Sequence, residues 1–234
     1  MNNVDKILGQ NKVERENAKE LIKKTIDANI SVTKDGYGCI FEGLSMPRFT
    51  PWEDRYSKRI TDNTFLSEMA LYNLEVFAKN ANELDGRFVE IGSWKGGSAK
   101  VISDVCGREN FICCDTFEGI QGAGVNDTFK DGDLATKISP LFDGLTVVKG
   151  DIRDKIKEFP HDEIAFLHID VDTYEITKFC LEEFFQQMVE NGIIIVDDYG
   201  CVFTQGAKKA VDEFCSETYM TPIALPTGQG LLLT

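Results

Sequence analysis

Four aspartates stand directly after two apolar runs in the second half of the chain. Asp170 and Asp172 end the stretch FLHIDVD, and Asp197 and Asp198 end the stretch GIIIVDD. If both runs are parallel strands joined by the intervening helix, their carboxyl ends lie side by side, at the edge where open α/β folds bind ligands. Unpaired carboxylates repel one another, and a hard divalent cation relieves that repulsion. The pattern therefore predicts a metal site that activates an oxygen nucleophile.

A structural interpretation of these aspartates stays open. Asp172 can cap the helix that follows it, and Asp197 with Asp198 can serve the next turn. The number of carboxylates favours the metal site, and so does the distance in sequence to the nearest cation, Lys178. His168 lies inside the first apolar run. We expect it to be buried and hydrogen-bonded rather than catalytic.

A glycine-rich turn, RFVEIGSWKGGS, follows the first predicted strand. Gly92, Gly96 and Gly97 allow a tight turn and a close approach of a ligand to the main chain. The spacing differs from the G-x-G-x-x-G of dinucleotide enzymes, because Trp94 replaces the middle glycine and Glu90 would repel a pyrophosphate. S-adenosyl-L-methionine, which has a sulfonium group and no phosphate, suits this turn better.

Two further strand ends carry groups suited to a nucleoside. Asp115 ends the second predicted strand and can accept hydrogen bonds from both ribose hydroxyls. Asp151 and Ile152 follow the third strand and could meet the edge and face of an adenine. Taken alone, a strand-end aspartate is more often a helix N-cap. The order of these groups on three successive strands indicates a nucleoside ligand.

Alternating apolar runs and helical periodicity predict an α/β domain from residue 61 to 234. Strands are expected near 87–91, 110–115, 145–149, 164–169 and 193–197. Helices are expected near 97–106, 133–142, 151–159, 174–190 and 205–217. The tail predicts two short strands, so the fold is a doubly wound, Rossmann-like, seven-stranded sheet with an antiparallel C-terminal hairpin strand. Residues 1–60 are expected to form an N-terminal helix and a lid segment, with the lid at residues 35–61 or, as the alternative, at residues 117–133.

Composition excludes several classes of function. The net charge of -14 at pH 7 disfavours nucleic acid as a partner. The seven cysteines form no CxxC pair and are expected to be reduced core residues. Without a predicted membrane span or signal peptide, the protein is expected in the cytoplasm. The apolar stripe of the N-terminal helix needs a cover, and this favours a homo-oligomer.

Taken together, the motifs resemble the macrocin O-methyltransferase family, metal-dependent enzymes that methylate sugar hydroxyls. The matching stretches are FVEIGSWKGGS, CDTFEG, FLHIDVDTYEITK, NGIIIVDDYG and GAKKAVDEF. They follow one another in the family's order between residues 61 and 217. The resemblance implies binding of S-adenosyl-L-methionine and Mg²⁺ and a small glycosylated or sugar substrate. It does not extend to the first 60 residues or to the 120–133 loop, so the identity of the substrate does not follow from it.

The resemblance also implies roles for single residues. The expected cofactor-binding residues are Glu90, Gly92, Ser93, Gly97, Ser98, Asp115, Thr116, Phe117, Asp151 and Ile152. The expected metal ligands are Asp170, Asp197 and Asp198, and the expected general base is Asp172. Three alternatives remain: an O-methyltransferase of catechols or other phenols, a nucleotide-dependent oxidoreductase, and a non-catalytic nucleoside-binding protein.

Overall fold

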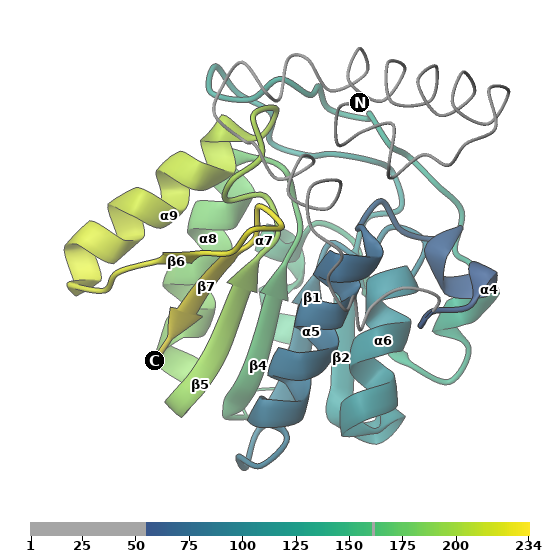
Figure 1. The fold of residues 1–234 in the computed structure, drawn as a ribbon. Helices are drawn as coiled ribbons and strands as arrows, with labels where there is room; N and C mark the ends of the chain where they lie inside the picture. Colours follow the sequence, from purple (N-terminus) through teal and green to yellow (C-terminus); the bar gives the residue numbers. More distant parts are fainter. Residues whose placement is uncertain (1–54, 161) are drawn as a thin grey trace, which may run out of the picture. The chain divides into compact units, whose positions relative to one another are not determined.

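The computed structural model describes residues 55–160 and 162–234, and these residues are built around one seven-stranded sheet. The strand order is β3-β2-β1-β4-β5-β7-β6 (Figure 1). The strands are β1 (Arg87–Ile91), β2 (Phe111–Asp115), β3 (Thr146–Lys149), β4 (Ile164–Ile169), β5 (Met188–Val196), β6 (Ile223–Ala224) and β7 (Gly230–Leu233). Strands β1 to β5 run parallel, whereas β7 is antiparallel to both β5 and β6. The predicted Rossmann-like sheet with its antiparallel C-terminal hairpin is confirmed.

Helices cover both faces of this sheet (Figure 1). The α-helices are α4 (Lys58–Thr61), α5 (Glu68–Ala81), α6 (Gly97–Cys106), α7 (Ile152–Lys155), α8 (Tyr174–Phe184) and α9 (Gln205–Thr218). Short 3-10 turns are η1 (Arg108–Asn110), η2 (Pro140–Phe142), η3 (Ile156–Glu158) and η4 (Phe185–Gln187). None of the helices in these described ranges is long and apolar enough to cross a membrane.

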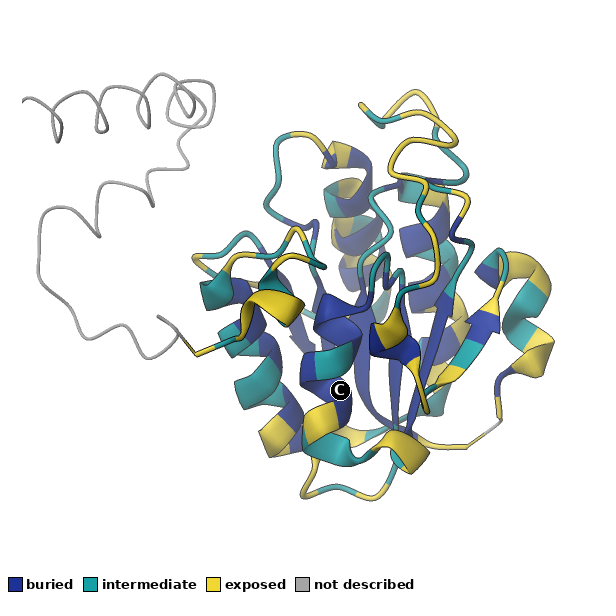
Figure 2. Ribbon diagram, turned by 90° about the vertical axis from the view of Figure 1, so that its right-hand side faces the viewer, coloured by how far each residue is buried: buried dark blue, intermediate teal, exposed yellow. Residues whose placement is uncertain are grey.

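Two apolar cores hold the layers together, one on each face of the sheet. Leu167 and Ile169 of β4 belong to the core that includes α8 and α9, whereas Phe166 belongs to the core that includes α5 and α6. This division follows from the alternation of side chains along a strand. Because both faces are covered, all six residues of β4 are buried, and Figure 2 shows the strands as the buried centre of the molecule.

Three predicted helices differ from the structure. Residues 133–142 contain no α-helix, because their main chain pairs with a neighbouring loop: Ile120 N donates to Asp133 O at 2.8 Å, and Thr136 N to Phe117 O at 3.1 Å. The helix expected at 174–190 ends at Phe184, and β5 already begins at Met188.

The helix expected at 151–159 is split into α7 and η3. The predicted N-terminal helix and most of the predicted lid segment at 35–61 lie outside the described residues.

The carboxyl ends of the central strands are tied together by main-chain hydrogen bonds. Asp170 N donates to Ile91 O, and Asp197 N donates to Ile169 O, each at 2.9 Å. Gly92 follows β1 with a φ of 83°, and a Cβ at this position would lie 1.8 Å from Asp170 O. Only glycine fits here. The glycine turn and the first aspartate of the acidic group are therefore in direct main-chain contact.

Candidate active site

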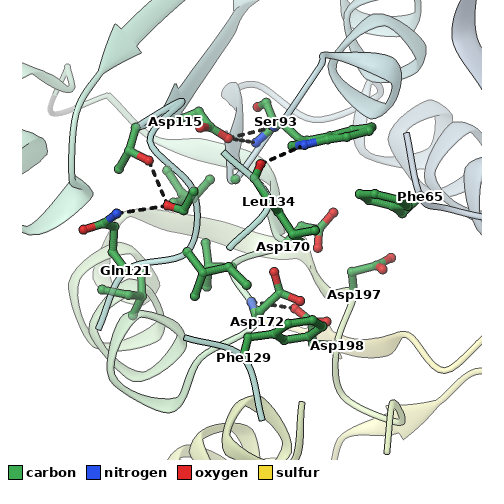
Figure 3. A pocket seen from close by; sticks show the side chains of 18 of the residues that line it. Phe65, Ser93, Asp115, Gln121, Phe129, Leu134, Asp170, Asp172, Asp197 and Asp198 are labelled. Carbon is green, nitrogen blue, oxygen red and sulfur yellow. Dashed lines mark hydrogen bonds between the residues drawn. The ribbon is translucent and has the colours of Figure 1, made fainter. Parts of the chain in front are cut away.

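A cavity of about 460 Å³ opens at the carboxyl ends of the strands. Such a volume suits a small-molecule ligand. Its lining includes the predicted residues Gly92, Ser93, Ser98, Asp115, Thr116, Asp151, Ile152, Asp170, Asp172, Asp197 and Asp198. In Figure 3, Ser93 and Asp115 lie toward one end of the view, and Asp172 and Asp198 toward the other. One cavity thus unites the predicted cofactor end and the predicted metal end.

Asp115 organises the cofactor end. Its Oδ2 accepts hydrogen bonds from Ser93 N at 2.8 Å and from Trp94 N at 2.7 Å, while its Oδ1 accepts one from Phe117 N at 2.6 Å. Burial raises the pKa of this carboxyl, although the three N–H donors oppose the shift. A carboxylate held in this way has one of its about four lone pairs left for a ribose hydroxyl, and it also braces the turn that carries Trp94 in a left-handed conformation, with a φ of 46°.

We expect Asp115→Asn to weaken S-adenosyl-L-methionine binding by about ten- to a hundredfold, because hydrogen bonds to a charged group contribute roughly 1.5–3 kcal/mol. The amide also turns an N–H₂ group toward backbone donors. Isothermal titration calorimetry measures the change, with the exposed Asp154→Asn as control. An affinity equal to that of the wild type would exclude Asp115 from donor binding.

Three of the predicted cofactor residues do not line the cavity. Glu90 is fully buried and accepts a hydrogen bond from Ser93 Oγ at 2.5 Å. Gly97 packs beneath the end of α4, and its N donates to Asn63 O at 3.0 Å. Phe117 is buried with its ring against Phe142. These residues pack behind the residues that line the cavity.

Asp151 reaches the cavity but is also engaged elsewhere. Its Oδ2 accepts a hydrogen bond from the Arg153 guanidinium at 2.6 Å, and its Oδ1 caps α7 through Arg153 N at 2.9 Å. The hydrogen bond from Arg153 lowers the pKa of Asp151. The N-cap interpretation of this strand-end aspartate therefore holds alongside its position in the cavity.

The four aspartates of the metal end all line the cavity. Burial, followed by the repulsion of neighbouring carboxylates, raises the pKa of Asp170 and of Asp198 well above the usual value. The same causes raise the pKa of Asp172 to about 6. Asp172 also has a φ of 63°, and its N donates to Asp198 Oδ2 at 2.9 Å. The sequence spacing thus correctly placed these carboxylates together.

No lysine or arginine of the described ranges forms an ion pair with these four carboxylates. The imidazole of His168 does approach one of them, with its Nε2 3.9 Å from Asp197 Oδ1. Burial lowers the pKa of His168, but the carboxylates of Asp197 and Glu90 outweigh it and raise the pKa to about 9. His168 is buried and bonded to Glu90 at 2.9 Å, as expected, yet its Nε2 has no hydrogen-bond partner.

The donor set fits a hard divalent cation in its chemistry. It offers carboxylate oxygens, and these repel one another. As the side chains stand, the described part of the chain contains no group of three or more His, Cys, Asp or Glu residues that is arranged to hold a metal ion. Loading would therefore require these carboxylates to turn toward a common point.

An apolar wall around the cavity was not assigned from the sequence. It consists of Phe65, Trp94, Phe129, Leu134 and Phe203. The rings of Phe65 and Trp94 are in a tilted contact with centroids 4.3 Å apart, and Trp94 Nε1 donates to Leu134 O at 3.0 Å. Phe65 nevertheless stays 69% exposed. Only the departure of the 120–133 loop from the family pattern pointed toward this region.

Asp127 anchors the 117–139 loop to the first residues of two helices. Its Oδ1 accepts a hydrogen bond from Tyr174 N at 3.1 Å. A Cβ on Gly206, at the start of α9, would lie 1.9 Å from the same oxygen. The carboxylate therefore sits against the N-terminal ends of α8 and α9, where helix dipoles favour negative charge. Phe129 and Leu134 of the same loop line the cavity.

Known methyltransferases resemble this chain in sequence and in fold. Residues 89–199 match the family described as "Methyltransferase domain". Demethyldecarbamoylnovobiocin O-methyltransferase from Streptomyces niveus is 27% identical over 158 residues, 57% of this chain and 59% of that protein. The 8-demethyl-8-(2,3-dimethoxy-alpha-L-rhamnosyl)-tetracenomycin-C 4'-O-methyltransferase from Streptomyces olivaceus is 26% identical over 144 residues, 51% of this chain and 55% of that protein. The chain spans little more than half the length of these two relatives.

Among solved structures, the O-methyltransferase NovP has a TM-score of 0.60 at 20% identity and covers 77% of this chain and 89% of its own. This likeness shows the fold. The two relatives are named as O-methyltransferases and not as macrocin methyltransferases. Their sequence similarity therefore supports a resemblance to O-methyltransferases in general and not to the macrocin family in particular. Residues 89–199 thus match a methyltransferase family model, and the described sheet has the fold of a solved O-methyltransferase.

Proposed function

We propose that this protein is an S-adenosyl-L-methionine- and Mg²⁺-dependent O-methyltransferase that acts on a sugar hydroxyl of a glycosylated small molecule. One observation carries the proposal: the four aspartates at the ends of β4 and β5 share a cavity with the turn held by Asp115. A methyl donor and an oxygen nucleophile would therefore meet in one space. The names of the two relatives, which include novobiocin and a rhamnosyl tetracenomycin, support a sugar acceptor.

The cofactor end suits a cationic nucleoside. Carboxylate Asp115 lies where ribose hydroxyls would bind, and Ile152 offers an apolar surface to a base. No lysine or arginine is among the described residues that line the cavity, and this disfavours a pyrophosphate. The same feature argues against the nucleotide-dependent oxidoreductase.

Metal binding and proton removal would fall to different aspartates. Asp170, Asp197 and Asp198 would hold Mg²⁺, which when bound lowers the pKa of a coordinated hydroxyl. Asp172 accepts the hydroxyl proton, and the freed electron pair forms the new O–CH₃ bond as the S–CH₃ bond of the sulfonium breaks. The products are the methyl ether, S-adenosylhomocysteine and a protonated Asp172. Positioning of both substrates and exclusion of water by the apolar wall supply the rest of the rate enhancement.

A phenolic acceptor is the second candidate. Its flat ring would pack well against the aromatic side chains that line the cavity, which are Phe65, Trp94, Phe129 and Phe203. The deciding experiment incubates the protein with S-adenosyl-L-methionine and Mg²⁺ and two acceptor sets, aryl glycosides of several deoxysugars and a series of catechols. Mass spectrometry detects the gain of a methyl group, and fragmentation locates it. Methylation on the sugar supports the first candidate, and methylation of catechols alone replaces it with the second. No methylation of any acceptor, with the donor bound, would leave a non-catalytic nucleoside-binding protein.

A further inference from the structure

A buried glutamine from the C-terminal hairpin lies behind the acidic end of the cavity. Because Val196 of β5 pairs with Gly230 of β7, the next residues along, Asp197 and Gln229, face each other across the two strands. Gln229 is only 1% exposed. Its Nε2 donates to Asp197 Oδ1 at 2.9 Å. The hairpin thus brings a neutral hydrogen-bond donor to one carboxylate of the proposed metal site.

The orientation of this amide is set by its other contacts. The Oε1 of Gln229 accepts hydrogen bonds from Asn73 Nδ2 at 3.0 Å and from Thr227 Oγ1 at 2.8 Å. Its Nε2 also donates to Ala70 O at 3.4 Å. A reversed amide would place its oxygen against a carboxylate and a carbonyl, both of which are acceptors. The donor side of Gln229 must therefore face Asp197.

A second buried group approaches the same carboxylate oxygen. His168 Nε2 lies 3.9 Å from Asp197 Oδ1, while its Nδ1 is engaged by Glu90. Both neighbours of Oδ1, His168 and Gln229, are buried. The Asp197 side chain itself lines the cavity and is 21% exposed. Buried groups of the protein interior thus contact one carboxylate oxygen of Asp197, while the side chain also borders the cavity.

We propose that Gln229 is a positioning residue that orients Asp197 for cation binding. By holding Oδ1, its amide keeps the other carboxylate oxygen available to a divalent ion without adding positive charge to the site. Hydrogen-bond partners of this kind around a metal ligand typically change metal affinity by about 10- to 100-fold. Asn73 of α5 and Thr227 of the β6–β7 turn hold the amide in place. The inference rests on the proposed function, since it presupposes the cation.

Electron paramagnetic resonance with Mn²⁺ as the probe tests this inference without an acceptor or turnover. The variant is Gln229→Met, which keeps the length of the side chain but cannot donate. The matched control is Thr234→Val, which removes a side-chain hydrogen bond to Val189 O at the other end of β7 and leaves the contacts of Gln229 in place. We expect Gln229→Met to bind Mn²⁺ about 10- to 100-fold more weakly than the wild type, and Thr234→Val to stay close to it.

The results that would contradict this proposal differ in what they exclude. Wild-type affinity in Gln229→Met, or an equal loss in both variants, overturns the positioning role and leaves the proposed function standing. No Mn²⁺ binding by the wild type removes the metal and this inference together.

If Gln229→Met does not fold, nuclear magnetic resonance of the wild type decides. The side-chain amide of Gln229 should shift on Mg²⁺ addition, whereas that of Asn80, on the exposed side of α5, should not. An unshifted Gln229 amide at saturating Mg²⁺ overturns the inference.

Discussion

Replacing Asp172 with Asn should lower kcat by about 10²- to 10⁴-fold, the usual contribution of a general base. The amide cannot accept the hydroxyl proton. The fold should survive the change, because Asn tolerates the left-handed backbone at this position, where φ is 63°. The main-chain hydrogen bond from residue 172 to Asp198 does not involve the replaced atoms. Steady-state kinetics with an acceptor that the wild type methylates measures the effect, and calorimetry should show S-adenosyl-L-methionine binding near the wild-type value.

The informative control for Asp172→Asn is Asp104→Asn. Asp104 is an exposed carboxylate on α6, away from the cavity lining, and its loss should leave kcat unchanged. A modest effect of Asp172→Asn, comparable to that of the control, would assign proton removal to another group. A loss of donor affinity equal to the loss of kcat would instead indicate that Asp172 acts in binding.

Removal of divalent cations should abolish turnover, and Mg²⁺ should restore it. Without the ion, the carboxylates of Asp170, Asp197 and Asp198 repel one another and no group lowers the pKa of the acceptor hydroxyl. The measurement is turnover after treatment with a chelator and gel filtration, followed by Mg²⁺ titration. Asp198→Asn should remain inactive at Mg²⁺ concentrations that fully restore the wild type. Full activity of the chelator-treated wild type would remove the metal from the mechanism.

Local patterns in the sequence identified most of the sheet. The apolar runs at β1, β2, β3 and β4 end within a residue of the predicted bounds, because buried parallel strands appear as short apolar runs. The predicted 133–142 helix failed for a non-local reason, since Asp133 O and Thr136 N bond to the 117–120 loop instead. Similarly, β5 extends back to Met188 because pairing with β4 stabilises residues that carry a helical pattern.

The acidic end of the cavity could be predicted because its residues follow directly from strand ends. Gln229 could not, since its contact with Asp197 depends on the pairing of β7 with β5. Phe65 likewise reaches the cavity only through the packing of its segment beside the glycine turn, where it meets Trp94. Groups that carry chemistry were visible in the sequence, whereas groups that orient them or shape the acceptor space depend on tertiary contacts.

The most direct test of the central claim is a crystal structure with Mn²⁺ and S-adenosylhomocysteine, with the ion located by anomalous scattering. We predict one anomalous peak within coordination distance of Asp170, Asp197 and Asp198, beside the product sulfur bound at the turn that Asp115 holds. A structure with the product bound and no ion among these three carboxylates would contradict the account.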